Sequence, residues 1–170
     1  MAVSDPQIDA SLAQLAARLL KCAAARECAW ALTDAAIQTF QLPDCVTYLL
    51  NADGHTLTQV AAYGPKIKLG QMIENAITLR VGQGIVGSVA STRLPIRIND
   101  TRRDPRYVLD DAPRLSELAI PLVHERRMFG VLDMEHEEVG FFNERHEASL
   151  MRMATLAAAR LAALRDQAQS

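Results

Sequence analysis

The sequence predicts an α+β fold in which helices at both ends of the chain cover one face of a central antiparallel sheet. Three observations lead to this prediction. Apolar residues recur at helical spacing near both ends, and the region between them contains several short strand patterns. Turn signals join neighbouring strands directly, as antiparallel hairpins require. The 170 residues suffice for one domain with its own core.

Two helices are predicted before the first strand. Ser4 or Asp5 can cap the first helix, with Pro6 in its first turn. The apolar stripe of this helix consists of Ile8, Leu12, Leu15 and Leu19. A second helix is predicted over about Ala25–Phe40, and Pro43 helps to end it.

Strand patterns begin after the second helix. The segments Cys45–Leu50 and Thr56–Tyr63 flank the turn Asn51–Gly54. The Asp-Gly step in this turn is typical of a hairpin, because glycine accepts the positive φ that the turn demands. The segment Lys66–Asn75 is compatible with a loop or a short helix, and the next strand is predicted over Ile77–Val81.

A glycine motif follows this strand. Gly82, Gly84 and Gly87 form a G-x-G-x-x-G pattern, which in isolation is typical of dinucleotide-binding loops. The helix that it opens reaches only to about Thr92, which is short for a parallel crossover, and no further βα units follow. We therefore interpret the glycines as a tight turn that lets the short helix lie close to the sheet.

The second half of the chain is predicted to end in a hairpin and a long helix. A short strand over 95–98 precedes a polar loop over 99–114. The clearest hairpin pairs residues 115–124 with residues 128–136. A final helix is predicted over 143–166, with Asn143 as its cap.

Charge and composition exclude several classes of partner. Lys and Arg number 18 against 20 Asp and Glu, giving a formal net charge of −2. This balance argues against a cationic nucleic-acid-binding surface. No apolar run is long enough to cross a bilayer, and the start of the chain lacks the apolar segment of a signal peptide. We therefore expect a cytoplasmic protein without nucleic-acid or membrane partners.

The potentially reactive residues show no catalytic or metal-binding pattern. The three cysteines have no paired spacing, which fits buried thiols in a reducing compartment. The four histidines are scattered, so no metal site is expected. The run Glu135–Glu138 is interpreted as the solvated end of the hairpin, and no pair of residues is placed for acid–base catalysis.

Several short motifs occur in an order that resembles GAF domains. These motifs are Gly82–Gly87, Ala90–Pro95, Asn99–Asp100, Asp104–Tyr107, Ser116–Leu122, Gly130–Asp133 and Phe142. The resemblance covers about 25–164 and implies one GAF domain over 1–170, with an N-terminal helix in 1–24 and a C-terminal helix over 143–166. It implies a GAF-like, PAS-related sheet with the N- and C-terminal helices on one face and a ligand pocket on the other.

The resemblance also implies a function. GAF domains of the bacterial regulatory type bind small molecules and act as sensors in signal transduction, so we expect a non-enzymatic sensor of a small molecule of unknown identity. They commonly form homodimers through the terminal helices and pass a signal to an output domain such as a kinase or cyclase. One alternative is a ligand-free dimerisation or adaptor module. The other is an enzyme similar to the free methionine sulfoxide reductases.

Specialised GAF members narrow the choice of cofactor. The sulfoxide reductases act through cysteines in the pocket region, one of them in the glycine motif where this chain has Val86. No cysteine follows Cys45, so neither a pocket thiolate nor a covalently bound bilin is expected. The Asn-Lys-x-x-Phe-x-x-x-Asp-Glu signature of cyclic-nucleotide-binding members does not occur. Haem, a cyclic nucleotide or another small ligand stay open.

Alternation along the hairpin predicts which side chains share a face. A turn at 125–127 places Val123 opposite Met128 and Ile120 opposite Val131. The small residues Ala119 and Gly130 then lie on the same face of the sheet, as expected beneath a closely packed helix. The predicted pocket face contains Ser116, Leu118, Ile120, Leu122, Phe129, Val131, Asp133 and Glu135. The predicted helix face contains Glu117, Ala119, Pro121, Val123, Met128, Gly130, Leu132 and Met134.

A polar set is predicted to bind the ligand within an otherwise apolar pocket. This set comprises Arg97, Asp100, Arg106, Tyr107, Ser116, Asp133 and Glu135, with Arg114 beside them in the loop. Structural roles are open for the same residues. Asp100 can cap a turn, Arg106 can pair with a nearby carboxylate, and Tyr107 can cover the core.

Overall fold

The chain forms one antiparallel sheet with helices on both faces. The computed structural model describes residues 3–65, 70–110 and 112–169. In chain order the elements are α1 (Asp5–Lys21), α2 (Ala25–Phe40), β1 (Asp44–Leu50), β2 (Thr56–Tyr63), β3 (Thr78–Arg80), α3 (Gly84–Thr92), β4 (Ile96–Ile98), the 3-10 turn η1 (Thr101–Arg103), β5 (Ser116–His124), β6 (Arg127–His136) and α4 (Glu144–Ala168). The strand order is β3-β2-β1-β6-β5-β4, and neighbouring strands are antiparallel.

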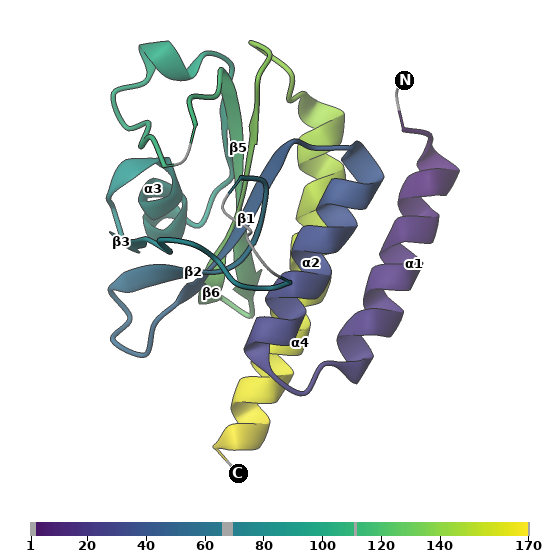
Figure 1. Ribbon diagram of the computed structural model, residues 1–170. Coiled ribbons are helices and arrows are strands. Elements are labelled where there is room, and N and C mark those ends of the chain that lie inside the picture. The colour runs from purple at the N-terminus through teal and green to yellow at the C-terminus, as the bar shows by residue number, and fades with distance from the viewer. Residues whose placement is uncertain (1–2, 66–69, 111, 170) are drawn as a thin grey trace.

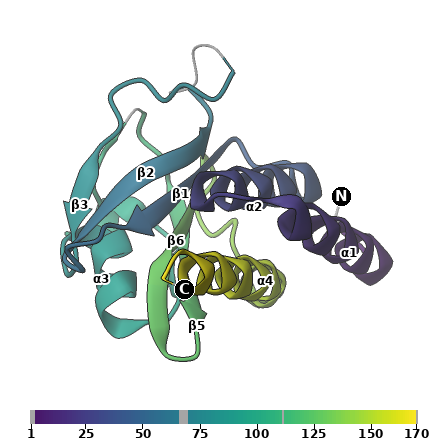
Figure 2. The same cartoon turned by 90° about the horizontal axis from the view of Figure 1, so that it is seen from below.

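The helices divide into two layers. Helices α1, α2 and α4 lie together on one face of the sheet, with α2 and α4 next to it and α1 outermost (Figures 1 and 2). Helix α3 lies on the opposite face (Figure 2). This arrangement confirms the predicted α+β fold with the terminal helices on one face.

The sheet separates two apolar cores. On the helix side, fully buried side chains from all three long helices meet those of β5 and β6, among them Leu15, Leu32, Leu132, Leu150 and Met153. On the other side, residues of α3 pack against β1, β2 and β6, among them Val46, Leu57, Ile85, Val89 and Val131. Burying each large aliphatic side chain contributes about 1.5–3 kcal/mol, so both cores stabilise the sheet.

Local signals place the terminal helices as predicted. The stripe of α1 is buried, and the Gln7 side chain accepts a hydrogen bond from the Ser4 backbone N–H at 2.8 Å. Asn143 Oδ1 accepts from the backbone N–H groups of Arg145 and His146 at 3.0 and 3.1 Å. These contacts satisfy amide groups that a helix start leaves without intrahelical partners. The prediction that Asn143 caps the last helix is therefore confirmed.

The glycine motif makes a close backbone approach. Gly84 has a φ of +69°, a conformation that favours glycine. A Cβ on Gly87 would lie 2.4 Å from the Arg80 carbonyl oxygen, so only glycine lets α3 lie this close to β3. The interpretation of the motif as a turn for helix packing is confirmed.

The register of the β5–β6 hairpin differs from the prediction by one residue. Val123 does pair with Met128, but Leu122 pairs with Gly130, which leaves Phe129 as an extra residue in β6. Because of this bulge, Ile120 faces Leu132 and not Val131. Alternation then reverses the face of the rest of β5, as a one-residue slip must.

Several face assignments are corrected as a result. Glu117 and Ala119 lie on the pocket side, whereas Leu118, Ile120 and Leu122 belong to the helix-side core. At the turn end of β6, Met128 lies on the pocket side and Phe129 on the helix side. The small size of Gly130 has another cause, because a Cβ there would lie 2.1 Å from the Tyr48 carbonyl oxygen of the neighbouring strand.

The remaining segments differ little from the expected boundaries. In the segment predicted as a loop or short helix over 66–75, residues 66–69 lie outside the described residues, and 70–75 form turns and one isolated bridge. The predicted loop over 99–114 contains the short turn η1. Among the helices that the structure describes, none has the length and apolar character required for a membrane span.

Candidate functional site

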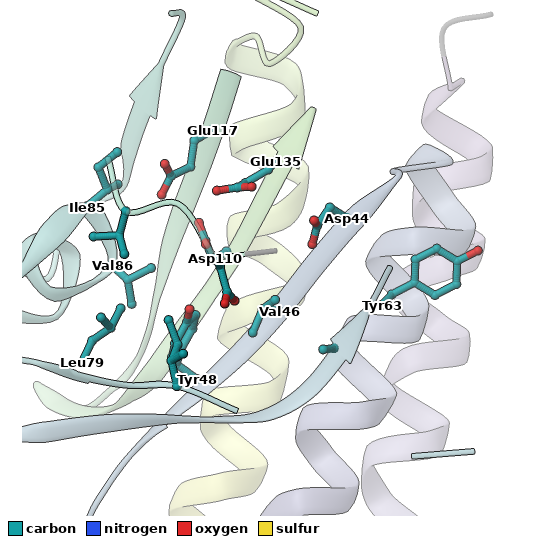
Figure 3. A pocket seen from close by; sticks show the side chains of 14 residues that line it. Asp44, Val46, Tyr48, Tyr63, Leu79, Ile85, Val86, Asp110, Glu117 and Glu135 are labelled. Atoms are coloured by element: carbon teal, nitrogen blue, oxygen red, sulfur yellow. The ribbon is translucent and has the colours of Figure 1, made fainter. Parts of the chain in front are cut away.

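A small cavity lies on the sheet face opposite the terminal helices. It is enclosed by β1, β2, β5, β6, the start of α3 and the loop that precedes β5 (Figure 3). Its lining residues are Asp44, Val46, Tyr48, Ala62, Tyr63, Ile77, Leu79, Ile85, Val86, Val108, Asp110, Glu117, Asp133 and Glu135. The cavity volume is about 30 Å³, so the site as it stands has room for only about two water molecules.

Three carboxyl groups from neighbouring strands gather in this cavity. Asp133 and Glu135 lie two residues apart on β6 and therefore share a face. Glu117 of β5 lies directly opposite Glu135 in the register. One oxygen from each of the three lies within 4.8 Å of the other two. We call Glu117, Asp133 and Glu135 the carboxylate cluster.

Burial determines the protonation of the carboxylate cluster. Desolvation, followed by the charge of Glu135, raises the pKa of Glu117 to about 8. Desolvation, followed by the charge of Glu117, raises the pKa of Asp133 well above its ordinary value. A side-chain hydrogen bond joins these two groups, so at least one of them carries a proton near neutral pH.

Part of the cluster has unmet hydrogen-bonding capacity. Glu117 is 3% exposed and Asp133 is 8% exposed. Within the described residues, Glu117 Oε2 and Asp133 Oδ1 have no hydrogen-bond partner outside this carboxyl pair. Buried polar atoms are costly when unsatisfied, so these two oxygens indicate a place for a ligand that donates hydrogen bonds or carries positive charge.

A buried ion pair closes the cavity next to the cluster. Arg114 Nη2 lies 3.2 Å from Asp44 Oδ2, and both side chains are 8% exposed. The Arg114 backbone N–H donates to Tyr107 Oη at 3.2 Å. The end of the loop is thereby held against the start of β1.

A second set of hydrogen bonds fixes the loop over the other side of the cavity. Gln59 Nε2 donates to Tyr48 Oη at 2.9 Å and to Asp110 Oδ2 at 2.6 Å. Gln59 Oε1 accepts from the Ile77 backbone N–H at 3.1 Å. Desolvation raises the pKa of Tyr48 well above its ordinary value, so its hydroxyl stays protonated. The buried amide of Gln59 thus positions an acidic and a phenolic group that both line the cavity.

The predicted ligand residues divide between the cavity and other places. Asp133 and Glu135 line the cavity, which also corrects the interpretation of Glu135 as part of a solvated end. Ser116 precedes Glu117 in β5, so alternation places its side chain on the face opposite the pocket. Its hydroxyl donates to the Glu138 carbonyl oxygen at 2.7 Å. Arg97 lies 3.4 Å from Glu147 of α4, on the helix side of the sheet.

The loop residues take up structural positions. Asp100 accepts from the Arg102 backbone N–H at 3.2 Å at the start of η1. Arg106 Nη2 pairs with Asp104 Oδ2 at 2.7 Å. Tyr107 packs against the pocket-side core. Their ligand-binding roles therefore remain predictions, with these structural contacts in place.

Five acidic or phenolic residues that line the cavity were not predicted from the sequence: Asp44, Tyr48, Tyr63, Asp110 and Glu117. Glu117 was assigned to the wrong face because a bulge leaves no mark in the alternation pattern. Asp44 pairs with Glu135 across β1 and β6, a register between strands far apart in the sequence. A Glu in a strand that is otherwise apolar, as in Ser116–His124, is the signal that could have singled out Glu117.

The thiols lie away from this cavity. Cys22, Cys28 and Cys45 are buried in the helix-side core. Desolvation raises the pKa of Cys28 to about 12 and that of Cys45 well above its ordinary value. Val86 lines the cavity at the position in the glycine motif where the resemblance places a reductase cysteine.

The match to a family model identifies the fold family. A model described as "GAF domain" matches residues 22–162. The chain belongs to the GAF domain family. The family expectation drawn from the motifs is thereby confirmed, and the central sheet with its helices is the GAF fold.

Three similar proteins extend this comparison. The free methionine-R-sulfoxide reductase of Escherichia coli K12 is 29% identical over 77 residues, covering 45% of this chain and 47% of the relative. The match thus spans about half of that relative's length. The structure of a free methionine-R-sulfoxide reductase from Neisseria meningitidis in complex with its substrate has a TM-score of 0.82 at 19% identity, covering 98% of this chain and 96% of that chain. The GAF domain of a phosphoenolpyruvate-protein phosphotransferase from Coxiella burnetii has a TM-score of 0.83 at 19% identity, covering 98% of this chain and all 100% of that chain. At such identities the solved structures show a shared fold.

These comparisons correct the functional expectation for this GAF domain. The sequence led us to expect a signal-transduction sensor that is not an enzyme. The curated relative is a free methionine-R-sulfoxide reductase, and so are several of the similar structures. The sensory, non-enzymatic prediction is therefore wrong by this comparison, and the reductase alternative is better supported.

Proposed function

We propose that this GAF protein is an enzyme that reduces a free amino-acid sulfoxide of the methionine sulfoxide type. The observation that carries the proposal is the buried carboxylate cluster, two of whose oxygens have no hydrogen-bond partner outside the Glu117–Asp133 pair, in a small cavity that aliphatic side chains also line. A free amino acid presents an ammonium group whose three N–H donors suit such a cluster. The likeness to proteins named as free methionine-R-sulfoxide reductases supports the choice of substrate class.

The electrons must come from external thiols. The chain's own thiols lie in the opposite core, and no cysteine lines the described cavity. In a balanced reaction, a first external thiol bonds to the sulfoxide sulfur as the oxygen leaves in water. A second thiol attacks the sulfur of the first, which releases the thioether and a disulfide. The two thiol protons end in the water molecule.

Residues of the chain bind the substrate and orient its sulfoxide group. The carboxylate cluster would hold the ammonium group. Tyr48 Oη accepts from Gln59, which leaves its own hydrogen to donate to the sulfoxide oxygen. Val46, Leu79 and Ile85 line the cavity and would contact the aliphatic part of the substrate while excluding water.

The loop before β5 must open to admit the substrate. Methionine sulfoxide has about ten non-hydrogen atoms and needs several times the volume of one water molecule. Val108 and Asp110 line the cavity from this loop, while Leu109 between them is 60% exposed. Breaking the Gln59–Asp110 hydrogen bond would release the loop and give both substrate and thiol access. Because these thiols are kept reduced in the cytosol, we also propose a cytoplasmic location.

Calorimetric titration in the presence of EDTA tests the binding step. We expect free methionine-R-sulfoxide to bind and its N-acetyl derivative to bind at least tenfold more weakly, because acetylation removes the ammonium charge. The variant Glu117→Gln should lose affinity for the free sulfoxide, and the matched variant Glu137→Gln, at an exposed position after β6, should not. Equal affinity for the free and the acetylated compound would rule out the proposed binding mode.

A further inference from the structure

A second and larger pocket lies at the end of the sheet, away from the carboxylate cluster. It is bounded by the turn between β1 and β2, the first residues of β6, the link between α1 and α2, and the last two turns of α4. Its volume is about 500 Å³, within the range of roughly 300–1,000 Å³ that small-molecule sites occupy. It shares no lining residue with the cavity of the carboxylate cluster. We call it the end pocket.

The walls of the end pocket are mostly apolar. Phe129 of β6 and Leu161 of α4 are buried, whereas Leu49 and Leu164 are half-buried. The other lining residues are Ala23, Ala24, Ala25, Leu50, Asn51, Ala52, Gly54, Met128, Arg165 and Ala168. The final turns of α4 extend past the strands beside the start of α2, which leaves this apolar surface open (Figure 1). Covering such a surface with an apolar ligand is favourable.

One charged residue lines this apolar pocket. Arg165 is exposed there, and within the described part of the chain its guanidinium forms no ion pair or hydrogen bond. The adjacent Asp166 pairs instead with Arg127 at 2.8 Å. Among the described lining residues there is no carboxylate. The end pocket therefore complements a ligand that carries negative charge.

The start of α2 adds a second positive feature to the same pocket. Ala24, the N-cap of this 16-residue helix, lines the pocket and has no side-chain group that could cap the first turn. The Glu27 carboxylate accepts from the Ala23 backbone N–H at 2.6 Å, but Glu27 does not line the pocket. Because the N-terminus of a helix attracts anions, it acts in the same direction as Arg165.

We propose that the end pocket binds a small amphiphilic carboxylate, namely a free fatty acid of medium chain length. Its alkyl chain lies against Leu49, Phe129 and Leu161, and its carboxylate faces Arg165 and the start of α2. A neutral or cationic head group would lack the favourable contact with Arg165. The site does not depend on the proposed function, because the two pockets have no lining residue in common.

Calorimetric titration with octanoate tests this site. We expect one octanoate per chain with a dissociation constant on the order of 10⁻⁴ M, which is ordinary for a ligand of about ten non-hydrogen atoms. The neutral 1-octanol should bind about three- to fivefold more weakly, which is the effect of one exposed ion pair. Octylammonium should bind more weakly still, because its charge has the same sign as that of Arg165.

Two variants with matched controls locate the ligand. Arg165→Gln should lower the octanoate affinity to that of octanol, and Arg152→Gln, at an exposed position of α4 outside the pocket, should not change it. Ala52→Trp adds an indole to the pocket wall and should weaken octanoate binding at least tenfold. Ala10→Trp, on the exposed side of α1, should leave it unchanged. All four changes are at exposed positions, so the variants should fold.

The contrary results are equally specific. Absence of saturable octanoate binding at about 1 mM, or binding that Ala52→Trp leaves unchanged, would overturn the site. Equal affinity for octanoate, octanol and octylammonium would overturn the choice of a carboxylate. Sedimentation velocity tests the other occupant: if octanoate does not bind and Ala52→Trp converts a dimer into a monomer, a second copy of the chain covers the end pocket and the proposal is wrong.

Discussion

Arg114 and Asp44 form a buried ion pair at the edge of the cavity, with each side chain only 8% exposed. Removing the guanidinium takes this ion pair away from the buried Asp44 carboxylate. We predict that Arg114→Met lowers the free energy of unfolding by about 3–5 kcal/mol, measured by urea denaturation. The double variant Asp44→Asn with Arg114→Met should recover most of this loss, because neither position then buries a charge. A single variant within about 1 kcal/mol of the unaltered protein would show that the pair contributes little.

His146 gives the protein a stability that depends on pH. Its Nδ1 accepts from the Asn143 backbone N–H at 3.3 Å, and its ring stacks on Phe141. Desolvation lowers the pKa of His146 below 6.5, helped by the nearby charges of Arg145 and His136. The unfolded chain therefore binds this proton more readily than the folded protein, so stability is lost as pH falls below about 6.5.

The predicted effect appears in a comparison of variants. Between pH 7.5 and pH 5.5, the unaltered protein should lose more unfolding free energy than His146→Gln, measured by urea denaturation at each pH. The matched variant His55→Gln, at an exposed turn position, should keep the full pH dependence. Identical slopes for the unaltered protein and His146→Gln would refute the assignment to His146.

At the scale of elements, the approach of α3 to β3 determines the shape of the cavity. Ile85 and Val86 at the start of α3 line the site, and Gly87 allows the close contact with the Arg80 carbonyl. We predict that Gly87→Ala lowers the free energy of unfolding by about 3 kcal/mol or more, because the helix must shift. It should also abolish sulfoxide binding.

A second glycine provides the control for this prediction. Gly140 has a φ of +68°, and among the described residues nothing lies within 4 Å of the place that a Cβ would take, so Gly140→Ala imposes only backbone strain. We expect a loss of roughly 1–2 kcal/mol and unchanged ligand affinity. Chemical denaturation measures the loss of unfolding free energy in both variants, and calorimetry measures their affinity for the sulfoxide. If Gly87→Ala and Gly140→Ala have the same effects on both quantities, the close approach of α3 does not have the role given to it here.

Elements with a strong local period were predictable, and the residue faces of one strand were not. The stripe in α1 and the cap at Asn143 follow from side chains within a few residues of each other. The turn of the β5–β6 hairpin was also placed correctly, since Val123 pairs with Met128. The bulge at Phe129 depends on how β6 fits between β1 and β5, which no local pattern records. Because of this extra residue, Glu117 lies in the cavity and not on the predicted helix face.

At the scale of the whole molecule, the site joins segments that the sequence keeps apart. Asp44 of β1, Glu117 of β5 and Asp133 of β6 meet only because the sheet places β6 between β1 and β5. The motifs were sufficient to predict the GAF fold, because they follow one another in a fixed order along the chain. They did not predict the function, since it depends on which side chains converge across strands. The homodimer through the terminal helices stays a prediction.

We propose that the cavity lined by the carboxylate cluster binds a free amino-acid sulfoxide, which external thiols then reduce. The direct measurement is chromatographic quantification of methionine formed from free methionine-R-sulfoxide in the presence of dithiothreitol and EDTA. We predict methionine and oxidised thiol in equal amounts, a rate that persists in Cys22→Ala and Cys28→Ala, and a loss of at least tenfold in Glu117→Gln but not in Glu137→Gln. Methionine formation no faster than with dithiothreitol alone would contradict the proposed reaction.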